Sequence, residues 1–171
     1  MTAKKSLLLV LCLALAAPWA FSADSPAASS APATVAFAPG DFYLSPQIVG
    51  VSAGTTGKIA LGVNGEYFVT KTIAVGADVN VYPKSPGAVA LFPDVEYHFD
   101  AHVQSLDLFI GGGPSVYFRF GTDSKTLFGV KGFGAARYFF DSHTGVFAKL
   151  GIGSTGSKVG GFGILGVSFK I

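Results

Sequence analysis

Residues 58–82 read KIALGVNGEYFVTKTIAVGADVNVY. Alternate positions are apolar before and after a polar Thr70-Lys71 pair, which we expect to form a two-residue turn. One face carries Ile59, Leu61, Val63, Tyr67, Val69, Ile73, Val75, Ala77, Val79 and Val81, and the other carries Lys58, Ala60, Gly62, Asn64, Glu66, Ala74, Gly76, Asp78 and Asn80. A period of two on both sides of a tight turn predicts a β-hairpin and does not fit a helix. The arms also match the roughly 9–11 residues of a tilted membrane-spanning strand.

Similar alternation continues along the chain and predicts eight extended segments in all. The other six are residues 42–53, 88–100, 102–120, 126–140, 144–153 and 161–171. Pro46 suits an irregular strand near a seam, and Pro93 suggests a β-bulge. The glycines before Pro114 resemble a nucleotide-binding loop only superficially, because neither a Lys-Ser/Thr pair nor a helical pattern follows them.

The first 40 residues have a different composition. Lys4 and Lys5 precede an apolar run over residues 7–17, and the small residues Ala20 and Ser22 follow, so we expect residues 1–22 to be a cleaved signal peptide. Cys12 lies within the apolar run, so a lipoprotein is an alternative. It is the weaker one, because the residues before Cys12 lack the small residue expected beside a lipidated cysteine. Residues 23–40 are rich in Ala, Ser and Pro, and we interpret them as a flexible leader. Residues 41–171 then form one domain.

Composition excludes several functional classes. Cys12 is the only cysteine, so the chain after cleavage has no disulfide, no thiolate metal site and no thiol nucleophile. Cleavage would also remove two lysines, leaving ten basic and ten acidic residues. A neutral chain without a basic patch gives no reason to expect nucleic acid as a partner.

Alternation alone fits either a soluble barrel with an apolar lumen or a membrane barrel with an apolar exterior. The polar face holds many Gly and Ala residues, which suit a narrow lumen better than a soluble surface. Half of the residues are hydrophobic and only 13% are charged, as expected of a lipid-facing exterior. Aromatic residues at segment ends suggest interfacial girdles: Tyr67, Phe68, Tyr97, Phe99, Phe118, Phe120, Tyr138, Phe139 and Phe140. We therefore predict an all-β, eight-stranded antiparallel up-and-down transmembrane β-barrel.

The signal peptide, the eight segments and the terminal sequence GVSFKI (residues 166–171) resemble the small outer-membrane barrels of the OmpA, OmpX and Opa type. This family usually ends on Phe, whereas here Phe169 lies two residues before the terminal Ile171. The resemblance implies the outer membrane of a Gram-negative bacterium, a periplasmic leader, and recognition of the last strand by the barrel-assembly machinery. It also implies periplasmic turns at 70–71, 100–101 and 141–143, and short surface loops at 54–57, 83–87, 121–125 and 154–159, which offer little adhesive surface.

The charges expected inside the barrel are divided by sign along the chain. The acidic members are Glu66, Asp78, Asp94, Glu96 and Asp107, and the basic members are Arg119, Lys131, Arg137, Lys149 and Lys170. Barrel closure would set the two groups opposite each other, and unpaired charges in a narrow lumen are costly. We therefore predict an ion-pair network that fills the lumen. A narrow channel lined by the same charges is the alternative.

Catalytic and metal sites find little support. The histidines are His98, His102 and His143. His98 shares its face with Asp94 and Glu96, which leaves a lipid-modifying outer-membrane enzyme as a further alternative. Ser142 would point away from His143 on a regular strand, and no third ligand joins His98 and His102 around a metal. We expect no enzyme activity, cofactor or metal, and a monomer whose partners are outer-membrane lipid and the assembly machinery. The expected role is structural, in envelope integrity or surface interaction.

Overall fold

The computed structural model describes residues 36–53, 56–83, 87–99, 105–121 and 124–171. These residues form eight strands and no helix. The strands are β1 (Phe42–Ala53), β2 (Thr56–Phe68), β3 (Ile73–Tyr82), β4 (Ala88–Phe99), β5 (Leu106–Arg119), β6 (Lys125–Phe139), β7 (Thr144–Thr155) and β8 (Lys158–Lys170). The described residues contain no helix long and apolar enough to cross a membrane.

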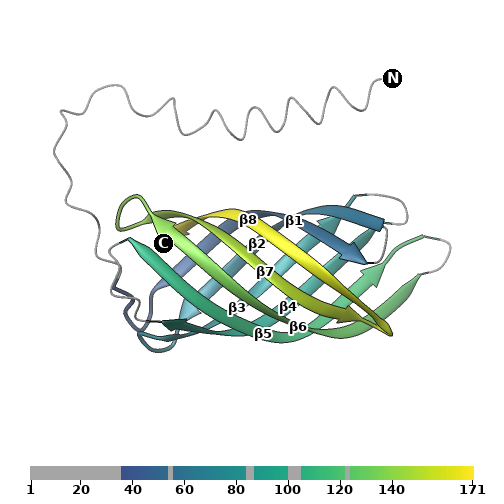
Figure 1. Ribbon diagram of the computed structural model, residues 1–171, viewed down its shortest axis with the longest axis horizontal. Helices are drawn as coiled ribbons and strands as arrows, with labels where there is room; N and C mark the ends of the chain where they lie inside the picture. Colours follow the sequence, from purple (N-terminus) through teal and green to yellow (C-terminus); the bar gives the residue numbers. More distant parts are fainter. Residues whose placement is uncertain (1–35, 54–55, 84–86, 100–104, 122–123) are drawn as a thin grey trace, which may run out of the picture. The chain divides into compact units, whose positions relative to one another are not determined.

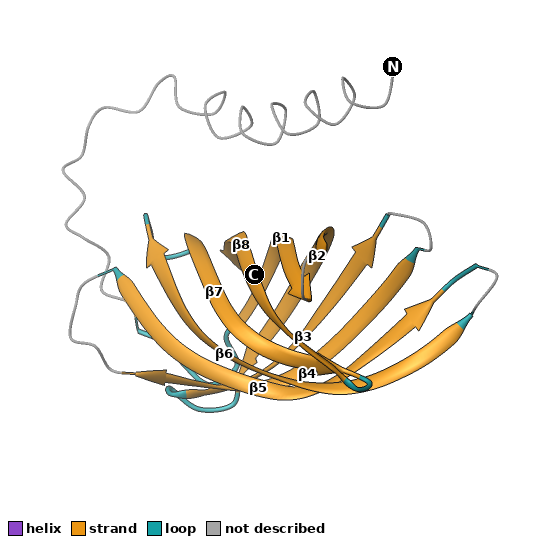
Figure 2. Cartoon of the chain, turned by 45° about the vertical axis from the view of Figure 1, so that its right-hand side comes forward, coloured by secondary structure: helices purple, strands orange, loops and turns teal. Residues whose placement is uncertain are grey.

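The strands close into one barrel in chain order (Figure 1). Every strand is antiparallel to its neighbours, and β1 pairs with β8 from Tyr43 opposite Lys170 to Ser52 opposite Gly161. Closure leaves no unpaired sheet edge. Turns and loops gather at the two barrel ends (Figure 2). The predicted all-β, eight-stranded antiparallel barrel is confirmed.

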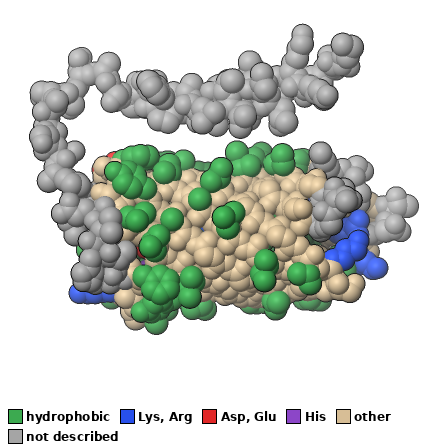
Figure 3. All heavy atoms as spheres, in the orientation of Figure 1, with side chains coloured by type: hydrophobic (Ala, Val, Ile, Leu, Met, Phe, Trp, Pro, Cys, Tyr) green, Lys and Arg blue, Asp and Glu red, His purple; other side chains and the backbone are tan. Residues whose placement is uncertain are grey.

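The exterior of the barrel is apolar. Ile59 and Leu61 expose 63% and 55% of their surface, whereas Ala60, Asn64 and Glu66 are buried on the lumen side. Figure 3 shows hydrophobic side chains over the outer wall, with charged side chains toward the barrel ends. So large an apolar exterior is unfavourable in water and suits a lipid environment. The predicted orientation of the two faces therefore holds.

Seven of the nine aromatic residues expected in interfacial girdles face outward. They are Tyr67, Tyr97, Phe99, Phe118, Phe120, Tyr138 and Phe140. The expectation is wrong for Phe68 and Phe139, which are 0% and 3% exposed and point into the lumen. Phe68 follows the outward-facing Tyr67, and Phe139 follows the outward-facing Tyr138. Because successive strand residues face opposite sides, both phenylalanines face the lumen.

Two hairpin turns differ from the predicted ones. The expected loop at 154–159 is a two-residue turn, because Thr155 pairs with Lys158 and Gly156 adopts a positive φ of 60°. Glycine has no Cβ to oppose that conformation. The expected two-residue turn at Thr70-Lys71 instead spans residues 69–72, where the Thr70 hydroxyl accepts hydrogen bonds from the backbone N–H groups of Thr72 and Ile73.

The bulge expected at Pro93 is absent. The pairing of β4 with β3 runs without interruption from Ile73 opposite Tyr97 to Tyr82 opposite Ala88. Pro93 faces outward, and the backbone of Gly113 on β5 lies so close to its carbonyl that a side chain there would clash. On the β5 side the pairing is interrupted over residues 92–94, but Leu91 pairs with Val116 and Val95 with Gly112, so no extra residue is inserted.

Several expectations fall outside the described residues. These are the signal peptide, most of the leader, the turn at 100–101, the first residues of the expected 102–120 strand, which include His102, and parts of three loops.

Candidate functional site in the barrel lumen

Aromatic side chains fill the barrel end where β1 begins and β8 ends. Tyr43, Phe68 and Phe139 form a buried cluster there, and Phe37 packs against it. The ring of Phe37 stacks on that of Phe68 with centroids 4.1 Å apart. Phe37 belongs to residues 23–40, which we expected to be a leader outside the fold. At least this residue of that segment instead packs in the barrel interior.

Arg137 lies immediately inside this aromatic cluster. Its Nη2 donates to Glu66 Oε2 at 2.6 Å, and its Nε lies 3.5 Å from Asp107 Oδ2. The guanidinium also lies over the rings of Tyr43 and Phe109, at 5.3 and 5.0 Å from their centroids. Arg137 is 1% exposed, so its charge depends on these contacts instead of on water.

His98 joins three carboxylates from three strands. Its Nδ1 lies 2.9 Å from Asp107 Oδ1, and its Nε2 lies 3.2 Å from Glu66 Oε1 and 3.6 Å from Glu96 Oε2. A histidine carrying protons on both ring nitrogens suits these neighbours, because each nitrogen is then a donor. The ring of His98 therefore connects β4 to carboxylates on β2 and β5.

Two lysines continue the network along the lumen. Lys149 from β7 donates to Glu96 Oε1 at 2.8 Å and lies over the rings of Phe133 and Phe147. Lys131 from β6 contacts both Asp78 and Asp94, on β3 and β4. The cations therefore reach across the barrel from β6 and β7 to the acidic residues of β2 to β5.

A neutral polar layer continues this part of the network. Gln47 Nε2 donates to Asp78 Oδ1 at 3.0 Å and to Asn80 Oδ1 at 3.1 Å. Gln47, Asn80 and Asn64 are each at most 4% exposed. Asp78 is therefore satisfied by a lysine on one oxygen and an amide on the other.

The structure brings eight of the ten expected charges together in this network: Glu66, Asp78, Asp94, Glu96, Asp107, Lys131, Arg137 and Lys149. The other two lie outside this cluster. Arg119 is the last residue of β5 and makes no ion pair within the described ranges. Lys170 is at the opposite end, where it pairs with Asp41 at 2.7 Å, and both side chains are partly exposed.

Sequence reasoning missed the position of His98 in the network and the aromatic rings that enclose the cations. It paired His98 with Asp94 and Glu96 along its own strand. The nearest carboxylate comes instead from β5, because His98 pairs with Phe109 in the register, two residues from Asp107. The inward position of Phe109 and Phe133 could have been predicted from the sequence, because both alternate with residues that face outward.

Glu66, Glu96 and His98 offer three ligand atoms within 4.8 Å of one another, which is a spacing that a metal ion can use. However, the two carboxylates also hold Arg137 and Lys149, and these cations would repel a divalent ion. The cluster is better explained as part of the ion-pair network.

Ser142 and His143 differ from the expectation that they point apart. The Ser142 hydroxyl and His143 Nδ1 share a hydrogen bond of 2.7 Å, because both residues lie in the turn between β6 and β7. The nearby Asp141 does not orient the imidazole. Its Oδ1 accepts from the backbone N–H groups of His143 and Thr144. Among the described residues, the exposed pair thus lacks the third group that holds a catalytic histidine in position.

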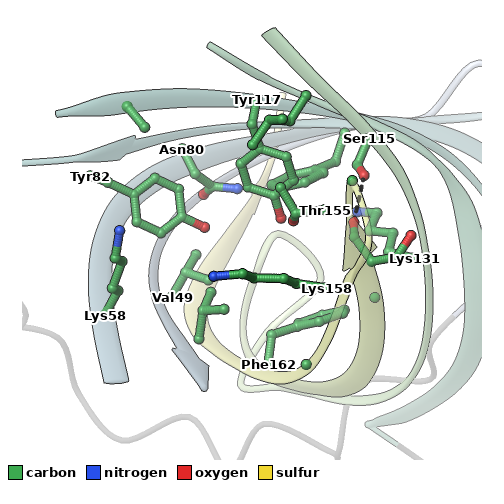
Figure 4. A pocket seen from close by; sticks show the side chains of 18 of the residues that line it. Val49, Lys58, Asn80, Tyr82, Ser115, Tyr117, Lys131, Thr155, Lys158 and Phe162 are labelled. Carbon is green, nitrogen blue, oxygen red and sulfur yellow. Dashed lines mark hydrogen bonds between the residues drawn. The ribbon is translucent and has the colours of Figure 1, made fainter. Parts of the chain in front are cut away.

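The lumen opens into a cavity of about 440 Å³ at the end opposite Phe37. Lys131 and Asp78 lie at its inner boundary, and Lys58, Arg119 and Lys158 are among the residues nearer the hairpins. Figure 4 shows this cavity, with Tyr82, Tyr117 and Phe162 around it.

Comparison with solved structures identifies this fold among bacterial outer-membrane proteins. The N-terminal β-barrel domain of OprF from Pseudomonas aeruginosa is similar, with a TM-score of 0.63 and 16% identity over 75% of this chain and 97% of that chain. Neisserial surface protein A gives a TM-score of 0.58 and 14% identity over 76% of this chain and 97% of that one. OprG from Pseudomonas aeruginosa gives 0.55 and 10%, over 83% and 99%.

No protein-family model matches the sequence. No curated protein matches it either. The solved structures share few identical residues with this chain, so they establish its fold and not its activity. The chain has the fold of the small eight-stranded outer-membrane β-barrels, which confirms the architectural resemblance inferred from its sequence.

Proposed function

We propose that this chain is a β-barrel of the bacterial outer membrane with a structural role, in envelope integrity or in interactions at the cell surface. The observation that carries the proposal is the transverse network in which Arg137, Lys149 and Lys131 bind carboxylates on the far side of the lumen. Such a network ties the opposing walls together and obstructs the passage. The stabilising work is then distributed over the lumen instead of being confined to a catalytic site.

Membrane location is supported by two independent observations. The outer wall is apolar along every strand, and the barrel resembles outer-membrane proteins in its fold. The expected signal peptide at residues 1–22 would supply the export step.

A narrow channel is the second candidate, because the cavity already hollows one end of the lumen as far as Lys131. In that case the obstruction between Lys131 and the aromatic cluster would have to rearrange. The charges of the network would then line the conducting path.

The structural role is tested in the bacterium that encodes the chain. Membrane fractionation should recover the protein with the outer membrane, and deletion of its gene should increase sensitivity to detergents and to large antibiotics. Re-expression of the wild-type chain should restore resistance, and a variant with Arg137→Glu should restore less. A deletion strain with unchanged envelope resistance and surface properties would contradict the proposal.

A further inference from the structure

The cavity at the barrel end opposite Phe37, called the outer cavity below, has an uneven distribution of charge. Five cations line it, and Lys131 is the one that pairs with Asp78. The other four are Lys58, Arg119, Lys125 and Lys158. None of these four makes an ion pair within the part of the chain that the structure describes. Among the described lining residues Asp78 is the only carboxylate, and Lys131 and Gln47 already bind it. The cavity therefore presents positive charge that its own described residues do not neutralise.

Two buried donor groups beside this cavity also have no hydrogen-bond partner within the described ranges. Tyr82 is 6% exposed and Asn80 is 1% exposed, yet neither the Tyr82 hydroxyl nor Asn80 Nδ2 makes a hydrogen bond among the described residues. Both residues line the cavity, and Figure 4 shows the Tyr82 hydroxyl directed inward and the Lys158 side chain extending into the space. Unsatisfied buried donors are unfavourable, and an acceptor in the cavity would satisfy them.

The remaining wall is apolar and aromatic. Val49, Phe92 and Ile164 are at most 5% exposed and line the cavity together with Tyr117 and Phe162. Phe92 and Tyr117 meet edge to face, with centroids 5.1 Å apart. The cavity volume of about 440 Å³ lies within the roughly 300–1,000 Å³ of small-molecule sites, which combine apolar walls with a few polar groups.

We propose that the outer cavity binds a small organic anion, a carboxylate or sulfonate attached to a flat apolar body. The anionic group would bind near Lys58 and Lys158 and accept from the free donors of Tyr82 and Asn80, while the apolar body would pack against the aromatic wall. This site is independent of whether the lumen conducts, because its inner boundary is the Lys131–Asp78 contact.

The test uses 2-naphthoate as the anionic probe and the full barrel in nanodiscs of zwitterionic phosphatidylcholine. Binding is measured by isothermal titration calorimetry against empty nanodiscs of the same lipid. We expect saturable binding of 2-naphthoate that weakens as salt is added, and at least tenfold weaker binding of the uncharged 2-naphthamide and of the cationic 2-naphthylmethylammonium.

Variants then locate the site. The double variant Lys58→Gln/Lys158→Gln should weaken binding about tenfold or more, and Tyr82→Phe, which removes only the hydroxyl, should weaken it severalfold. Lys71→Gln removes an exposed lysine at the opposite end and is the matched control, with unchanged affinity expected. Heat-dependent gel mobility checks that each variant is folded.

Three results would overturn the proposal: binding no stronger than to empty nanodiscs, equal binding of the anionic, neutral and cationic probes, or unchanged affinity in folded Lys58→Gln/Lys158→Gln and Tyr82→Phe variants. The first would leave the cavity without an anion site, the second would make it an unselective apolar space, and the third would move the site elsewhere on the barrel.

Discussion

Arg137 Nη2 lies 2.6 Å from Glu66 Oε2, and this contact joins β6 to β2 across the lumen between residues 71 positions apart in sequence. Both side chains are 1% exposed. A buried ion pair contributes little compared with an apolar pair of the same volume, but it becomes costly when one partner is lost. The predictions for the interior follow from this asymmetry.

Reversal of the arginine charge should destabilise the barrel strongly. Arg137→Glu would place a third carboxylate beside Glu66 and Asp107 and remove their cation. We expect the free energy of unfolding to fall by about 3–5 kcal/mol. Urea titration of the barrel in phospholipid vesicles measures this change, with far-UV circular dichroism as the signal for unfolding.

Lys71→Glu is the control for that reversal, because Lys71 is exposed in the turn between β2 and β3. It should change the free energy of unfolding by no more than about 0.5 kcal/mol. Equal stability of the Arg137→Glu variant and the wild-type chain would show that the network contributes nothing to the fold.

Close packing between strands should make one glycine intolerant of a methyl group. A Cβ at Gly166 would lie 2.7 Å from the Pro46 carbonyl oxygen and would also press on the Phe147 ring, whereas a Cβ at Gly134 would have no atom within 4 Å. Gly166→Ala should therefore cost about 1–3 kcal/mol. Gly134→Ala should be close to neutral, and a comparison of the two urea midpoints tests the difference. Identical midpoints would mean that the strands yield easily at Gly166.

The apolar exterior should show the depth dependence of a lipid-facing wall. Leu150 and Val159 are 73% and 72% exposed, but Leu150 is in the middle of β7 and Val159 is near the hairpin end of β8. Leu150→Arg should cost about 2–4 kcal/mol in vesicles, and Val159→Arg about 0–1 kcal/mol. A similar cost at both positions would contradict a membrane-spanning orientation of the strands.

The fold could be predicted because its signal is local. Alternation such as that from Ile59 to Val69 assigns each side chain to a face without knowledge of any other strand. The same alternation places Phe68 and Phe139 in the lumen. We assigned them to the exterior only because aromatic residues at strand ends are typical of interfacial girdles.

The partners in the lumen could not be predicted in the same way. Which cation meets which carboxylate depends on strand register and barrel shear, which are properties of the closed sheet. A shift of two residues would move His98 away from Asp107 and Arg137 away from Glu66. The position of Lys170 beside Asp41 likewise depends on where β1 and β8 join at the seam.

The most direct test of the closed lumen is single-channel conductance of the barrel refolded into a planar bilayer. The ion-pair network predicts a folded barrel without discrete openings in the wild-type chain, and openings in the Glu66→Gln/Arg137→Gln variant, which weakens the central obstruction. Discrete wild-type openings whose conductance changes with Glu66→Gln or Arg137→Gln would contradict the closed lumen and identify the charges as the lining of a channel.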